Sequence, residues 1–120
     1  MHESALLKSI GQRKSDKEQI ANRVAENPRL IPEVLGGLRA KRADTKYGCA
    51  KVLRIISEKY PHVLYPSIDF FIGLLQSDNT ILRWEGIHVL GNLAAVDSEN
   101  KIDEILDEYL DSIGISIFID

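Results

Sequence analysis

Hydrophobic residues recur at three- and four-residue steps along most of this chain, which is the spacing of one face of an α-helix. The clearest run is residues 78–96, where Ile87, Leu90 and Leu93 lie on one stripe and further apolar residues flank it. A helix that is apolar over so much of its circumference is packed on more than one side. We therefore expect this run to lie in the centre of an all-helical fold, with Trp84 partly buried.

The same spacing along the whole chain predicts about seven helices in a single domain that covers residues 1–120. Polar residues that cap a first turn, and prolines and glycines that interrupt the pattern, set the expected ends. Ser15 and Glu18 fit a capping box, and Asp78 is placed to cap the longest apolar helix. The expected helices cover residues 3–10, 16–26, 29–40, 45–60, 62–76, 79–96 and 101–113, followed by a tail at 114–120.

Several glycines fall inside these expected helices, where each costs about 1 kcal/mol relative to alanine. The positions are Gly36, Gly37, Gly86 and Gly91. We expect them to permit the close approach of a neighbouring helix. A strand is not favoured for residues 78–96, because the apolar run is long and does not alternate.

The apolar pattern repeats at a shift of 37 residues. The second helices of the two copies correspond at four core positions: Val52 with Val89, Leu53 with Leu90, Ile56 with Leu93, and Ser57 with Ala94. The helices in front of them match at the same shift, Ile31 with Ile68, and Ile68 leads on to Ile105. A period in the thirties with two helices per unit is typical of an α-solenoid.

The repeated residues resemble the second helix of a HEAT repeat. That pattern has an aspartate at the turn, a Val-Arg pair, small residues and leucines at core positions, and this chain has Leu82-Arg83 in place of Val-Arg. The matching residues are Asp78, Arg83, Gly86, Leu90, Leu93 and Ala94, and upstream Asp44, Lys46, Cys49, Leu53 and Ile56. The resemblance covers roughly residues 27–111. It implies a right-handed α–α superhelix of stacked helical pairs, and it leaves function open because such repeats serve many roles.

Composition is that of an ordinary globular domain, with 44% hydrophobic and 28% charged residues. No run approaches the ~20 apolar residues that cross a bilayer, and the first residues lack the pattern of a signal peptide. The single cysteine cannot form an internal disulfide. We therefore expect a cytoplasmic protein that does not associate with membranes.

Charge is unevenly distributed along the chain, although the net charge is only −3. Residues 29–62 hold eight basic and three acidic side chains, whereas residues 97–120 hold one basic and eight acidic. Two interpretations stay open: solvated faces that maintain solubility, or a stripe that binds an acidic partner. The basic residues of that stripe are Arg39, Lys41, Arg42, Lys46, Lys51 and Arg54. In HEAT arrays the second helices line the concave surface, so the resemblance implies that Lys51, Arg54, Glu85 and His88 face a ligand.

Few residues suggest catalysis or metal binding. Cys49 lies among apolar neighbours, which favours a small buried hydrophobe over a nucleophile. The three histidines are far apart, and none has a second ligand at the spacing of a zinc site. The acidic residues between Asp103 and Asp111 occupy the outer face of an amphipathic helix, which favours solvation over a metal cluster. We therefore expect no enzyme activity, no cofactor and no metal.

The function that we expect is a non-catalytic scaffold or adaptor that binds another protein through its repeat surface. The alternative is a nucleic-acid-binding protein similar to the HEAT-like DNA glycosylases, using the basic segment from Arg39 to Arg54; the pI of about 5.6 counts against it. A HEAT-like lyase or chaperone subunit acting on a chromophore-carrying protein is a third hypothesis, which rests on the resemblance alone. The tail Ile115–Asp120, with Phe118, is where we expect contact in a homodimer.

Overall fold

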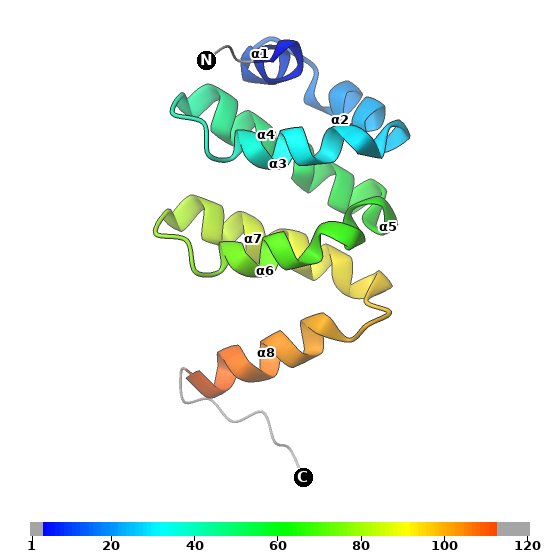
Figure 1. The fold of residues 1–120 in the computed structure, drawn as a ribbon, viewed down its shortest axis with the longest axis vertical. Coiled ribbons are helices and arrows are strands. Elements are labelled where there is room, and N and C mark those ends of the chain that lie inside the picture. The colour runs from blue at the N-terminus through cyan, green and yellow to red at the C-terminus, as the bar shows by residue number, and fades with distance from the viewer. Residues whose placement is uncertain (1–3, 113–120) are drawn as a thin grey trace.

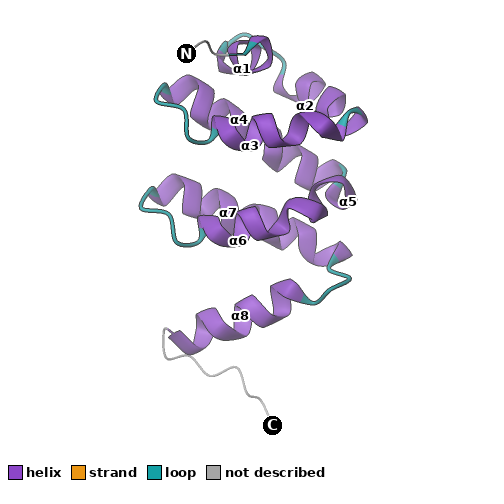
Figure 2. Cartoon of the chain, in the orientation of Figure 1, coloured by secondary structure: helices purple, strands orange, loops and turns teal. Residues whose placement is uncertain are grey.

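Between residues 4 and 112, the part of the chain that this computed structural model describes, every regular element is a helix (Figure 1, Figure 2). The α-helices are α1 (Ala5–Gly11), α2 (Lys17–Glu26), α3 (Ile31–Gly37), α4 (Ala43–Lys59), α5 (Pro61–Leu64), α6 (Ile68–Leu74), α7 (Thr80–Leu93) and α8 (Lys101–Ser112). Short 3₁₀ turns join them: η1 (Pro28–Leu30), η2 (Tyr65–Ser67) and η3 (Ala94–Val96). This confirms the predicted all-α class for these residues. The predicted tail at 114–120 lies outside them.

Two helix pairs form the middle of the molecule. Helix α3 packs on α4, α6 packs on α7, and α4 contacts α7 between the pairs. Helices α1 and α2 also pack on α4, and Figure 1 shows α1 and α8 at opposite ends of the 52 Å long axis. The two pairs are the two copies of the sequence repeat, so equivalent positions are 37 residues apart.

Prolines divide the first helix of each pair. We expected continuous helices over residues 29–40 and 62–76. In the structure a 3₁₀ turn precedes α3 in the first segment, and η2 separates α5 from α6 in the second. The turn η1 starts at Pro28, and η2 contains Pro66. The ring of proline removes one backbone donor and crowds the preceding turn, so a short 3₁₀ segment forms before the regular helix.

Two predicted helix caps are wrong by one residue. Asn79, not Asp78, caps α7, because its side chain accepts a hydrogen bond from the Leu82 backbone N–H at 3.1 Å. Asp16, not Ser15, caps α2 by accepting from the Gln19 N–H at 3.1 Å. Neighbouring residues with equal capping preference compete, and the extended backbone at Asn79 and Asp16 decides which side chain reaches the first turn.

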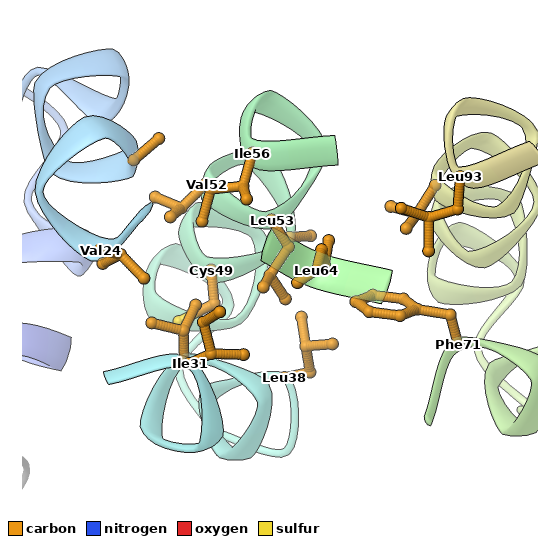
Figure 3. Close-up of a cluster of buried hydrophobic side chains, with 14 of the residues drawn as sticks. Val24, Ile31, Leu38, Cys49, Val52, Leu53, Ile56, Leu64, Phe71 and Leu93 are labelled. Atoms are coloured by element: carbon orange, nitrogen blue, oxygen red, sulfur yellow. The ribbon is translucent and has the colours of Figure 1, made fainter. Parts of the chain in front are cut away.

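The core runs through both pairs and is centred on α4. Val52, Leu53 and Ile56 are each at most 1% exposed, and Cys49 is fully buried as predicted. Figure 3 shows Phe71 extending from α6 toward the cluster around Leu64, which joins the second pair to the first. Burial on this scale is the main favourable term that holds the pairs together.

Close helix contacts occur at one glycine in each pair, on opposite partners. In α3, a Cβ added to Gly37 would meet the Sγ of Cys49 on α4. In the second pair the small residue is Gly86 of α7, where an added Cβ would lie 3.0 Å from the Cβ of Leu74 on α6. The prediction of close approach is therefore right for Gly37 and Gly86. It is wrong for Gly36 and Gly91, where an added Cβ would meet nothing within 4 Å.

Several contacts hold α8 to the second pair, including the pairing of Lys101 with Asp69 of α6, and the side chain of Asp97 makes the largest number of hydrogen bonds among them. Its carboxylate accepts hydrogen bonds from the backbone N–H groups of Lys101 (3.0 Å) and Ile102 (2.9 Å), and from the Tyr65 hydroxyl (2.7 Å). Burial alone raises the pKa of Asp97, but these hydrogen bonds outweigh it and the pKa lies below its usual range. Asp97 thus both caps α8 and ties it to η2.

Replacing Asp97 with alanine is expected to loosen α8 while leaving the two central pairs folded. Because the folded pKa is lowered, the ionised carboxylate stabilises the docked helix at neutral pH, and this contribution is lost as the pH falls through the folded pKa. We expect wild-type α8 amides to lose protection from hydrogen exchange below about pH 4, whereas the variant is several-fold less protected already at neutral pH. Glu104→Ala, an exposed change on the same helix, is the control. Equal α8 protection in D97A and wild type would contradict the role given to Asp97.

Candidate functional site

The basic residues singled out in the sequence do not form one surface. Arg39, Lys41 and Arg42 are exposed together in the turn between α3 and α4. Lys46 is half-buried on the first turns of α4, and its Nζ lies 5.9 Å from the centroid of the Tyr47 ring. The turn therefore carries a compact group of positive charge, and the basic residues further along α4 have other surroundings.

Lys51 lines a polar hollow of about 360 Å³ between α2 and α4. Arg13 and Lys17 share the hollow with it, but so do the carboxylates of Asp16 and Glu18. Burial and the charge of Lys51 lower the pKa of Lys17, and Asp44 opposes the shift. The hollow is thus of mixed charge.

The resemblance also assigned Arg54, Glu85 and His88 to a ligand-facing surface. In the structure these residues make contacts between α4 and α7. Arg54 Nη1 of α4 lies 3.3 Å from Glu85 Oε1 of α7, and His88 Nε2 lies 3.2 Å from Glu58 Oε1. The Glu85 side chain is only 20% exposed, and its Oε2 is buried without a hydrogen-bond partner among the described residues. These contacts link α4 to α7, so the structure gives Arg54 and Glu85 a role in joining the two pairs.

The outer face of α7 is apolar and open. Among the described residues, the large hydrophobic side chains that are exposed all lie on this helix: Ile81 (53%), Trp84 (66%) and Ile87 (42%). The predictions that Trp84 is partly buried and that Ile87 belongs to the packed stripe are therefore wrong. Leu82, Val89 and Leu93 hold the buried face of α7, and Trp84 and Ile87 point away from it.

An apolar groove adjoins this face, between the second pair and α8. Its volume is about 360 Å³, and all of its lining residues are apolar or glycine. They come from α6 and its C-terminal turn (Ile72, Leu75), from α7 and η3 (Ile87, Leu90, Gly91, Ala94) and from α8 (Ile102, Ile105). We missed this groove in the sequence. Its signal was the hydrophobic character of α7 over much of its circumference, which we interpreted as packing on more than one side.

Comparison with known proteins gives no assignment. No protein-family model, curated protein or solved structure matches this chain. Among the side chains that the structure describes, no three His, Cys, Asp or Glu come together as metal ligands. No helix in the described part of the chain is long and apolar enough to span a bilayer. The groove lining offers no acid, base or nucleophile, so the chemistry that it can perform is the binding of apolar side chains.

Proposed function

We propose that this chain is a non-catalytic, HEAT-like helical-repeat scaffold that binds another protein in the cytoplasm, with its helical pairs stacked as a right-handed superhelix. The observation that carries the proposal is the open apolar face of α7 together with the groove beside it. We place the binding surface there, rather than on the basic residues of the first repeat.

The physical reason is the free energy of exposed apolar surface. Ile81, Trp84 and Ile87 stand in solvent on one face of one helix, and Ile87 continues into a groove without polar lining. Contiguous apolar patches of this kind on a protein surface mark interaction sites. Tryptophan in particular is enriched where binding energy is concentrated in protein interfaces.

The repeat pattern also supports a scaffold. Repeat proteins of this kind build extended surfaces that contact ligands over several units. The basic turn at Arg39, Lys41 and Arg42 lies on the α3–α4 pair, whereas the groove lies between the α6–α7 pair and α8. A partner on the groove therefore meets an apolar and acidic end of the molecule.

The test is capture of a partner by the immobilised chain, with one groove variant and one matched control. Ile87→Asn removes apolar surface from the groove at an exposed position, and Lys51→Asn makes an exposed change on α4. We expect I87N to retain about one tenth or less of the partner that wild type retains, because burying an isoleucine contributes roughly 1.5–3 kcal/mol. K51N should capture as wild type does.

Other results would contradict the proposal in distinct ways. Capture that I87N leaves unchanged would place binding elsewhere on the chain. Nucleic acid retained by wild type and lost in K51N would favour the basic first repeat and the nucleic-acid alternative. The helix content of wild type, I87N and K51N, measured by circular dichroism, must be the same for the comparison to be valid.

A further inference from the structure

The contact between α4 and α7 shows how one unit of this chain holds the next helix. The Tyr47 hydroxyl accepts a hydrogen bond from the Asn79 side-chain amide at 3.1 Å, and the Ser57 hydroxyl accepts one from Asn92 at 3.0 Å. Between them Arg54 pairs with Glu85 at 3.3 Å. Tyr47, Arg54 and Ser57 therefore mark the face of α4 that α7 covers.

The equivalent face of α7 is open. A shift of 37 residues carries Tyr47 to Trp84, Arg54 to Gly91 and Ser57 to Ala94, and all three of the later residues are exposed. The same shift carries Ala50, which is 3% exposed, to Ile87, which is 42% exposed. The face that holds a helix in the first unit thus recurs in the second, where the described residues leave it open along the groove and α8 lies on the other side of that groove.

The open face of α7 differs from the equivalent face of α4 in its side-chain chemistry as well as in its exposure. Where α4 has a hydroxyl, a guanidinium and a second hydroxyl, α7 has an indole, a glycine and a methyl group. Gly91 stands in the interior of α7 with open space around its Cβ position. A helix lying on this face meets apolar groups at close range, so its contacting side must also be apolar.

The segment of the chain that forms the groove is strongly negative. Residues 63–112 contain ten acidic and two basic side chains. On α8, Asp103, Glu104, Asp107 and Glu108 are exposed, and Ile102 and Ile105 of the same helix line the groove. These carboxylates lie on the outer face of α8, away from Ile102 and Ile105, so their attraction for an occupant of the groove acts at longer range. An apolar site on so acidic a segment favours an occupant with a net positive charge.

We infer that the groove beside α7 binds a basic amphipathic helix from another polypeptide, seated on α7 as α7 is seated on α4. This inference rests on the proposed function and specifies the class of partner. The helix carries apolar residues at i, i+4, i+7 and i+11, the spacing of Leu82, Gly86, Val89 and Leu93 on the buried face of α7. Lysine or arginine occupies its flanks, where the net negative charge of residues 63–112 attracts it.

A second copy of this chain fits the groove less well. Its exposed large hydrophobic residues, within the described part, are those of α7 itself, so its basic unit has no apolar helix face to insert. Residues 113–120 of the chain are apolar enough to enter the groove, but they contain no basic residue. A basic helix satisfies both the lining and the charge of the site.

The test is a titration of the full chain with a synthetic helical peptide, in which the fluorescence of Trp84 reports binding. Trp84 is the single tryptophan of the sequence and lies on the open face, so covering that face shifts its emission to shorter wavelength. The probe is a peptide of about 16 residues, or four helical turns, with leucine at the four positions above and lysine and glutamine elsewhere. A peptide of the same composition with its leucines redistributed around the helix is the control. We expect saturable binding of the first peptide only.

Two variants and a salt series locate the peptide. Ile87→Asn should weaken binding about tenfold or more. Lys51→Asn is the control, because Lys51 is an exposed residue of the hollow between α2 and α4 and does not line the groove; its affinity should equal that of wild type. Raising the ionic strength from about 50 mM to about 500 mM should weaken binding severalfold, because exposed charge pairs are screened.

The alternatives give different results. Preference for a glutamate version of the peptide, or equal affinity of I87N and wild type, would overturn the inference. A blue-shifted Trp84 emission in the absence of peptide would mean that something else already occupies the groove. If dilution reverses the shift, the occupant is a second copy of the chain. If deletion of residues 113–120 reverses the shift, the occupant is that segment. If I87N fails to capture a native partner but the lysine peptide does not bind wild type, the partner class is wrong and the proposed function stands. If both tests leave Ile87 without effect, the proposed function fails as well.

Discussion

Phe71→Ala is expected to destabilise the chain by about 3–5 kcal/mol, which is a large fraction of the stability of a domain of this size. Phe71 is 1% exposed, the largest fully buried side chain among the described residues, and it connects α6 to the cluster between the pairs. Removing its ring leaves a cavity that rigid helices on several sides can only partly close. The loss falls on the contact between the two units, so we expect the second pair and α8 to lose structure first.

Equilibrium unfolding in urea, followed by circular dichroism, measures this change. Phe70→Ala is the matched control, because Phe70 contacts the Phe71 ring edge to face at a centroid distance of 5.6 Å but is only partly buried. Its loss should be clearly smaller than that of F71A. Equal destabilisation by the two variants would show that Phe71 does not have the central position that its burial indicates.

Gly48→Ala is expected to destabilise by about 1–3 kcal/mol, although alanine is the better helix former. An added Cβ at Gly48 would lie 2.6 Å from the backbone carbonyl oxygen of Ile10 and 2.9 Å from its Cγ2. A backbone atom cannot rotate out of the way as a side-chain tip can, so α1 must move off α4. Ile10 is fully buried, and its displacement exposes apolar surface.

Gly91→Ala provides a control of opposite sign. The same substitution in the interior of α7 meets nothing within 4 Å, so the gain in helix propensity should raise stability by about 0.5–1 kcal/mol. Urea midpoints at unchanged slope report both changes. A stabilising G48A would mean that α1 and α4 are further apart than their contact at Ile10 indicates.

The all-helical class could be predicted from the sequence because it depends on local spacing, and several helix ends lie within two residues of the predicted ones. The errors at Asp78 and Ser15 have a physical origin: several adjacent residues had equal capping preference, and only the backbone conformation selects among them. The divided first helices show a similar limit, since a proline near a helix start is compatible with a regular turn or a 3₁₀ turn.

The candidate site was less predictable. The charge pattern indicated Arg54 and the family resemblance indicated Glu85 as candidate binding residues. Their pairing between α4 and α7 depends on how two helices meet, which no local pattern specifies. The face of α7 was misjudged for a related reason. The hydrophobicity of Trp84 and Ile87 indicates that their surface favours burial. It does not indicate whether another part of the same chain or a separate molecule packs against that surface.

The opposite placement of the glycines in the two helix pairs bears on the fidelity of folding. A chain with two similar units risks exchanging partners during assembly, as repeat proteins do. If α3 packed on α7, Gly37 would face Gly86 and leave a gap; if α6 packed on α4, Leu74 would press on Cys49. One wrong pairing leaves a cavity and the other causes a clash, so both are unfavourable. Because the glycine lies on the first helix in one pair and on the second helix in the other, α3 packs well only on α4, and α6 packs well only on α7.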